Sequence, residues 1–111
     1  YGGFGMNKVK LYINGNAKNF LGYLSRSSHI IVKGNVGKLL GALSRNSIFE
    51  IYGYTDKEIG YGIRKTKIIF YNVPINIVEN NLSSYIPSGE IEVYNNGKRF
   101  TLVKNGRTFY I

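Results

Sequence analysis

The stretch that decides the fold runs from residue 9 to residue 84 and divides into four blocks: VKLYINGNAKNFLGYLSRS (9–27), SHIIVKGNVGKLLGALSRN (28–46), SIFEIYGYTDKEIGYGIRK (47–65) and TKIIFYNVPINIVENNLSS (66–84). Each block has nineteen residues, and the first three keep two glycines and one arginine in step. The first glycine column is Gly15, Gly34 and Gly53, the second glycine column is Gly22, Gly41 and Gly60, and the arginine column is Arg26, Arg45 and Arg64. An internal period near twenty residues indicates a solenoid, with one structural unit per block.

Each block opens with a short run of β-prone residues in which apolar side chains alternate with a middle residue. This period of two residues is typical of a strand with one buried face. We therefore expect the following residues to point inward and to stack from block to block: Leu11, Ile13, Ile30, Val32, Phe49, Ile51, Ile68 and Phe70. A second apolar column contains Leu21, Leu40, Ile59 and Val78.

The glycine columns predict where the chain turns. The first glycine column follows the strands, with Asn72 in its place in the fourth block, and both residue types tolerate a positive φ. We expect the second glycine column at tight corners, where a side chain would strike the neighbouring block. Nineteen residues are too few for a strand–helix–strand crossover, but they suit one coil of a parallel β-helix with columns about 4.8 Å apart. The sequence thus predicts an all-β fold, a short, single-stranded, right-handed parallel β-helix of about four coils.

The repeat also resembles a known family. The phrases GNAKNFLGYLSRSSHIIVKG (15–34) and GNVGKLLGALSRNSIFEIYG (34–53) are similar to the Gly-x-Gly-x-Gly β-helix family. That family includes the C subunit of formylmethanofuran dehydrogenase and the C-terminal domain of the glutamate synthase large subunit. The resemblance covers Val9 to about Asn72, and its Gly-x-Gly element is complete only at Gly60-Tyr61-Gly62, because Leu24 and Leu43 replace the later glycine. It implies a scaffold beside catalytic subunits, without chemistry of its own.

The fourth block departs from the repeat. Pro74 removes a backbone donor, and Asn80-Asn81 stand near the place of the second glycine. Ile75 to Leu82 could form one amphipathic helical turn or another β-helix coil. We favour the coil.

Beyond the repeat, the sequence predicts a three-stranded antiparallel meander that caps the solenoid. Asn96-Gly97 and Asn105-Gly106 are strong two-residue hairpin turns between β-prone runs. The first of these runs ends in Tyr94-Asn95, an echo of Tyr71-Asn72 twenty-three residues earlier, so it would also serve as a fifth rung. The single domain then divides into a β-helix over 6–88, a cap over 89–111, and a tag or tail over 1–5 that lies outside the fold.

Composition excludes several classes of function. The chain of 111 residues has no cysteine, so it contains no disulfide, thiol nucleophile or cysteine zinc site, which fits a cytoplasmic protein. His29 is the only histidine, and we interpret it as a side chain at a strand entrance. The carboxylates show no paired spacing, and Ser25 and Ser44 have no base partner. We expect no metal, cofactor, small-molecule substrate or membrane span, and no enzyme active site of its own.

Positive charge is the one feature that a plain scaffold does not require. Fifteen lysines and arginines stand against six acidic residues, a formal net charge of +9. The arginine column would place three guanidinium groups along one edge, with Lys65 beside the last of them. The plain interpretation is a solvated basic face. The functional interpretation is an anion-binding ladder, with Tyr23 and Tyr61 in the nearby corners to stack on bases.

Three functions fit these observations. The first is a non-catalytic structural or interaction module, a scaffold that docks on a partner protein or on itself. The second is a basic nucleic-acid-binding protein that uses the arginine column. The third follows from the resemblance alone and is an accessory subunit of an enzyme like glutamate synthase or formylmethanofuran dehydrogenase.

Overall fold

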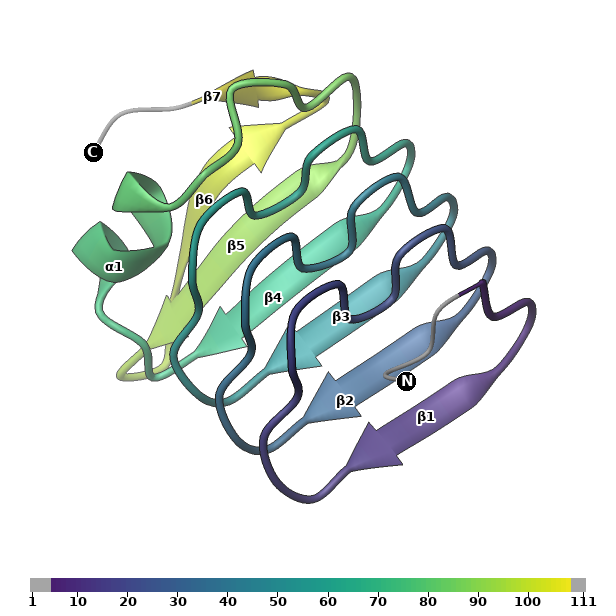
Figure 1. Ribbon diagram of the computed structural model, residues 1–111. Coiled ribbons are helices and arrows are strands. Elements are labelled where there is room, and N and C mark those ends of the chain that lie inside the picture. The colour runs from purple at the N-terminus through teal and green to yellow at the C-terminus, as the bar shows by residue number, and fades with distance from the viewer. Residues whose placement is uncertain (1–4, 109–111) are drawn as a thin grey trace.

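A computed structural model describes residues 5–108 of the chain. Figure 1 shows stacked coils whose strands form one sheet of seven strands in chain order. The elements are β1 (Lys10–Ile13), β2 (His29–Val32), β3 (Ile48–Ile51), β4 (Lys67–Tyr71), α1 (Ile75–Asn80), β5 (Glu90–Asn95), β6 (Lys98–Lys104) and β7 (Arg107–Thr108). Strands β1 to β5 pair in parallel, and β5, β6 and β7 pair antiparallel. The predicted β-solenoid of about four turns with an antiparallel cap is therefore confirmed.

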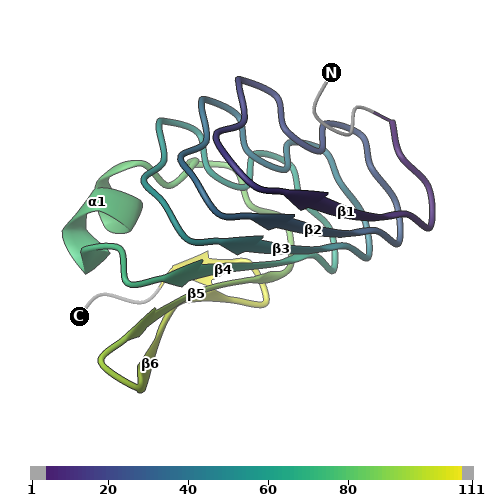
Figure 2. The same cartoon turned by 90° about the horizontal axis from the view of Figure 1, so that it is seen from below.

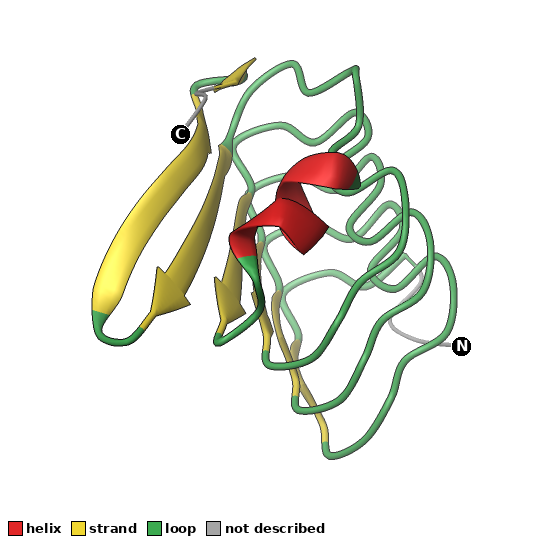
Figure 3. Ribbon diagram, turned by 90° about the vertical axis from the view of Figure 1, so that its left-hand side faces the viewer, coloured by secondary structure: helices red, strands yellow, loops and turns green. Residues whose placement is uncertain are grey.

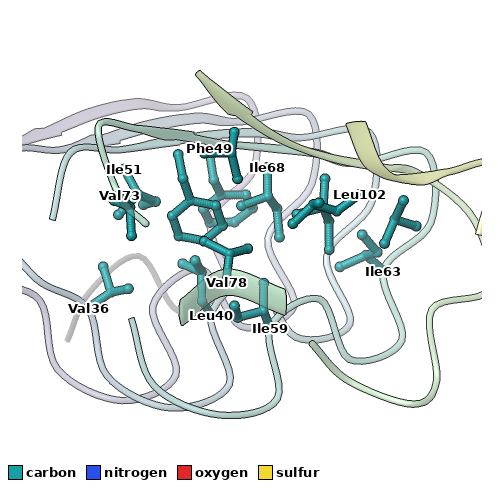
Figure 4. Packing of buried hydrophobic residues seen from close by; sticks show 14 of the residues in the cluster. Val36, Leu40, Phe49, Ile51, Ile59, Ile63, Ile68, Val73, Val78 and Leu102 are labelled. Atoms are coloured by element: carbon teal, nitrogen blue, oxygen red, sulfur yellow. The ribbon is translucent and has the colours of Figure 1, made fainter. Parts of the chain in front are cut away.

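The register of the strands follows the nineteen-residue repeat. Leu11 pairs with Ile30, Ile30 with Phe49, and Phe49 with Ile68, as the apolar columns predict. The inward residues of β2, β3 and β4 are completely buried, whereas Leu11 and Ile13 in the first coil are only partly buried. Figure 4 shows buried side chains of the sheet, among them Phe49, Ile51 and Ile68, meeting those of the opposite wall, such as Val36, Leu40 and Ile59, in one core.

The fourth coil differs from our prediction, because it contains a helix. Pro74 immediately precedes α1, where its missing N–H costs no helical hydrogen bond. The coil is twenty-three residues long, since Lys67 pairs with Glu90. The four extra residues supply about one helical turn, and the chain rejoins the coil at Leu82, which bridges Ile59. Leu82 thus takes the place we assigned to Val78, which is buried in the core from α1 instead.

The cap closes the C-terminal end of the solenoid. Strand β5 pairs in parallel with β4 and so forms the fifth rung, as the Tyr-Asn echo predicted. Both hairpin turns have two consecutive residues with positive φ, the requirement of the tight turns expected at Asn96-Gly97 and Asn105-Gly106. Figures 2 and 3 show β6 continuing the sheet past β5 and α1 lying over the same end of the coils. Together they cover the apolar interior at this end.

Glycine is needed in the two columns for different physical reasons. The three glycines of the first column do not have a positive φ, whereas Asn72, which takes their place in the fourth coil, has a φ of 58°. The expectation was therefore wrong for the glycines and right for Asn72. A Cβ added to Gly53 would instead lie 2.3 Å from the backbone oxygen of Gly34, which shows that the coils approach too closely for a side chain. The second column does adopt positive φ, and a Cβ at Gly22 would meet the ring of Phe49. Glycine is required there by both conformation and space.

Replacing Gly53 with alanine is expected to lower the free energy of unfolding by about 1–3 kcal/mol, because the coil backbones must move apart. Gly15 provides the matched control in the same column, since nothing lies within 4 Å of a Cβ added there. Gly15→Ala should change stability by less than about 1 kcal/mol. Urea denaturation followed by circular dichroism measures both variants. Equal losses would contradict the close-approach explanation.

Candidate functional site

The arginine column lies at the corner that precedes each strand. Arg26, Arg45 and Arg64 form successive parallel bridges, so their side chains leave the backbone in register, about one strand spacing apart. The N–H of Arg45 donates to the oxygen of Ser25, and its carbonyl accepts from the N–H of Ser27. The backbone is thus fixed on both sides, and the side chains are exposed.

A ladder of buried hydroxyl groups holds these corners. The hydroxyl of Ser28 donates to the carbonyl oxygen of Arg26 at 2.8 Å, and that of Ser47 donates to Arg45 at 2.9 Å. Thr66 repeats the contact with Arg64 at 3.1 Å. Because buried polar groups must be paired, these bonds fix the backbone of each arginine and so the point from which its side chain extends. The ladder was visible in the sequence as serine or threonine two residues after each arginine, a spacing that we did not interpret.

The arginines form one wall of a groove of about 380 Å³, which we call the arginine groove. Its lining consists of Leu24, Arg26, Leu43, Arg45, Gly62, Arg64 and Tyr85. Leu24 is 45% exposed, and Leu24 and Leu43 have φ values of 60° and 57°. A left-handed conformation costs a bulky side chain about 1–2 kcal/mol, and Gly62 avoids this cost at the equivalent place. The two leucines therefore occupy strained positions and present apolar surface beside three cations.

Among the residues that the structure describes, no carboxylate lines the arginine groove. Glu50 hydrogen-bonds His29 and Tyr71 on the outer face of the sheet, whereas Glu90 and Glu92 lie 3.8 and 3.6 Å from Lys67. Asp56 accepts the N–H of its neighbour Lys57. The positive charge of the groove is thus not neutralised by the acidic side chains of the chain, and it will attract anions.

The other residues predicted near the arginines are not part of the groove lining, although Tyr61 contacts one lining residue. Lys65 lines a separate hollow of about 350 Å³ with Lys67 and Glu90, outside the arginine groove. Tyr23 packs edge-on against Phe20, and Tyr61 packs edge-on against Tyr85. Tyr85 is the aromatic side chain that lines the groove, and sequence reasoning missed it because the helical insertion displaces it from the nineteen-residue repeat.

Sequence reasoning also missed a polar cluster on the outer face of the sheet. Nε2 of His29 hydrogen-bonds Oε2 of Glu50, and the hydroxyl of Tyr71 donates to Oε1 at 3.0 Å. Burial, the hydrogen bond to Glu50 and its charge raise the pKa of Tyr71 to about 12. Residues twenty-one apart are diagonal neighbours on adjacent strands of a nineteen-residue coil, and this spacing could have revealed the cluster. Because both oxygens of Glu50 are engaged, the cluster joins three strands.

A tyrosine stack lies beside this cluster. The rings of Tyr52 and Tyr71 are 4.6 Å apart and nearly parallel, and Tyr94 continues the stack at 5.5 Å. Lys33 places its Nζ 3.7 Å from the centre of the Tyr52 ring. The Tyr52 ring is therefore contacted by Lys33 and Tyr71, and the Tyr71 ring by Tyr52 and Tyr94. This arrangement stabilises the sheet from outside, as cross-strand aromatic pairs do.

The described residues offer few groups for chemistry. Within residues 5–108, no group of three histidine, cysteine or acidic side chains is arranged to hold a metal ion. Ser25 and Ser44 are completely buried. No helix in the same range is long and apolar enough to cross a membrane.

Comparison of the chain with family models, with curated proteins and with solved structures found no match. The resemblance to the Gly-x-Gly-x-Gly family therefore stays a prediction from the sequence.

Proposed function

We propose that this protein is a non-catalytic interaction module that docks on a partner protein through the arginine groove. The observation that carries the proposal is the composition of the groove, in which three in-register arginines stand beside the exposed Leu24 and the partly buried Leu43, with no carboxylate from residues 5–108 in the lining. The ligand that fits is an extended acidic peptide with apolar side chains. Its carboxylates would contact the guanidinium groups, and its apolar side chains would cover Leu24 and Leu43.

A left-handed backbone recurs at the coil corners, at Phe20 and Leu39 as well as at the groove leucines, so the exposure of Leu24 rather than the strain itself supports a binding role. Strained residues persist where the surrounding structure forces them or where function requires them. Gly62 takes the equivalent corner in the third coil without a side chain, and the side chain of Leu43 fills the space that a Cβ would occupy there. Arginine and tyrosine are also the residues that contribute most often to the energetic centres of protein interfaces, and both line this groove.

The test is a titration of fluorescent poly-glutamate against the wild type and against a variant with Arg26, Arg45 and Arg64 replaced by glutamine. We expect the triple replacement to weaken binding about tenfold at low salt, with a difference that shrinks as salt rises. A matched control replaces Lys98, Arg99 and Lys104 on β6, which removes the same charge from another exposed surface. Equal weakening by the two variants would remove the groove from the functional account.

The leucines give a second, independent variant. Leu24→Gly combined with Leu43→Gly should relieve strain and leave the fold intact, because Gly62 already occupies the same corner. The measured ligands are peptides of alternating glutamate and leucine, or of alternating glutamate and serine. The double variant should lose the preference for the leucine peptide. A preference unchanged from the wild type would contradict a role for the leucines.

Nucleic-acid binding is the second candidate, favoured by the net charge of +9. It requires a stacking surface for bases, and the described lining of the groove contains a single tyrosine. Single-stranded DNA and RNA belong in the same titration. A nucleic acid that binds more tightly than the peptides, with a salt slope lowered by roughly 0.7 for each arginine removed, would favour this candidate. An accessory subunit, the role implied by the resemblance, would use the groove to hold its catalytic partner.

A further inference from the structure

Within residues 5–108, strand β1 has a row of backbone groups without a partner. It is the first strand of the sheet, and no other strand among the described residues lies outside it (Figure 1). The N–H of His29 donates to the oxygen of Val9, and that of Lys33 donates to Ile13. Because alternate residues of a parallel ladder face one neighbour, Lys10, Tyr12 and Asn14 turn their N–H and C=O groups to the free edge. Such an edge is a template for another strand.

The apolar interior is incompletely covered at the same end. Leu11, Ile13 and Ala17 in the first coil are only partly buried, whereas Val32 and Val36 in the second coil are 0% and 5% exposed. Residues 5–8 add backbone pairing to the corner at Tyr23 and Arg26, but not to β1. The opposite end carries β6 and α1, as Figure 3 shows. Within residues 5–108, the solenoid is therefore capped at one end only.

A second copy of β1 matches this edge in one orientation. Two identical edges that pair in parallel would turn their apolar faces to opposite sides of the sheet. In an antiparallel pair centred on Tyr12, Leu11 faces Ile13 of the other copy, and both interiors lie on the same side. Lys10 then faces Asn14 of the other copy, so no lysine of β1 opposes another lysine. Each outward-facing N–H meets an outward-facing C=O.

We propose that the chain forms a symmetric dimer by antiparallel pairing of β1 across Tyr12, which joins the two solenoids into one sheet with a shared apolar interior. The interface is isologous, as two-fold symmetry requires. The pairing uses strand addition, in which the backbone supplies the hydrogen bonds and alternate side chains supply specificity. It is independent of the arginine groove, so failure of one proposal leaves the other intact.

Sedimentation equilibrium of the full chain should give twice the 12.5 kDa of one chain, with a return to one chain on dilution. Tyr12→Pro removes only an outward-facing N–H, so the β1–β2 ladder survives while the dimer is lost. Tyr12→Thr keeps that N–H and should remain dimeric. A single-chain mass for the wild type up to its highest soluble concentration would overturn the proposal. So would a Tyr12→Pro variant that folds and dimerises as the wild type does.

Cysteine cross-linking tests the register of the antiparallel β1 pair, and it does not require the proline variant to fold. The chain has no cysteine, so Tyr12→Cys would supply the only thiol. Two copies of residue 12 would have their Cα atoms about 5.5 Å apart, within the range of a disulfide. Ile31→Cys on β2 is the matched control, because its two copies would be roughly 14 Å apart. Mild oxidation should link the first variant and not the second. Equal linking of both variants, or none of Tyr12→Cys, would reject the register.

Discussion

Replacing Phe49 with alanine is expected to lower the free energy of unfolding by about 3–5 kcal/mol, the largest single-residue effect that we predict. Phe49 is 0% exposed, and its ring fills the space beside the second glycine column, where Gly22 and Gly41 leave room for it. Alanine would leave a cavity lined by residues of three coils, which the fixed ladders prevent from collapsing. Since small domains are stable by only about 5–15 kcal/mol, the variant would approach the limit of folding.

Urea denaturation followed by circular dichroism measures this effect. Phe20 provides the control, because it is 45% exposed at a corner and forms a T-shaped pair with Tyr23. Phe20→Ala should cost no more than about 1.5 kcal/mol. Phe49→Leu, which retains most of the volume, should lie between the two. A Phe49→Ala variant as stable as Phe20→Ala would show that the coils can close around the missing ring.

Deletion of residues 89–111 is expected to convert the protein into aggregate. The deletion removes β5, which pairs with the whole of β4, and with it the buried Ile91, Val93 and Leu102. The free edge of β4 and the apolar side chains beneath it would then be exposed, and an uncapped solenoid end is prone to association. The loss of folded, soluble protein should be nearly complete.

The measurement is the soluble yield and the sedimentation profile of the truncated chain. A shorter truncation after Lys104 is the matched control, because it leaves β5 and β6 in place and removes β7, which pairs with β6 at two positions among the described residues. That chain should keep the yield and the assembly state of the full chain. If the longer deletion also stayed soluble and folded, the cap would be dispensable.

The sequence predicted the stacking well, because a repeat carries its own register. Once Leu11, Ile30 and Phe49 occupy one column, the nineteen-residue period determines which strand residues pair. The alternation of apolar side chains then determines which face of each strand points inward. The fourth coil was harder. Val78 and Leu82 are both apolar and both fit the second column, and only the pairing of Glu90 with Lys67 decides between them. That pairing depends on the whole sheet, which a single block does not contain.

The arginine column was predicted and the groove beside it was not. Leu24 and Leu43 have left-handed backbones, and leucine is a residue for which propensity argues against this conformation. Nothing local could place their side chains beside the arginines. The cluster of His29, Glu50 and Tyr71 was missed for a different reason, since same-column stacking was considered and diagonal neighbours were not.

The helical insertion in the fourth coil shows that a coil can change in length without a change in the register of its strands. That coil has four more residues than its neighbours, yet β4 and β5 pair without a shift. The entropic cost of closing a loop rises only slowly with its length. Extra residues between a strand and the second apolar column therefore lower the stability very little. Related chains can therefore diverge by insertion at this side of the solenoid while their strands remain aligned. A comparison that assumes a constant nineteen-residue period would lose such relatives at the first insertion, although their sheets would superimpose.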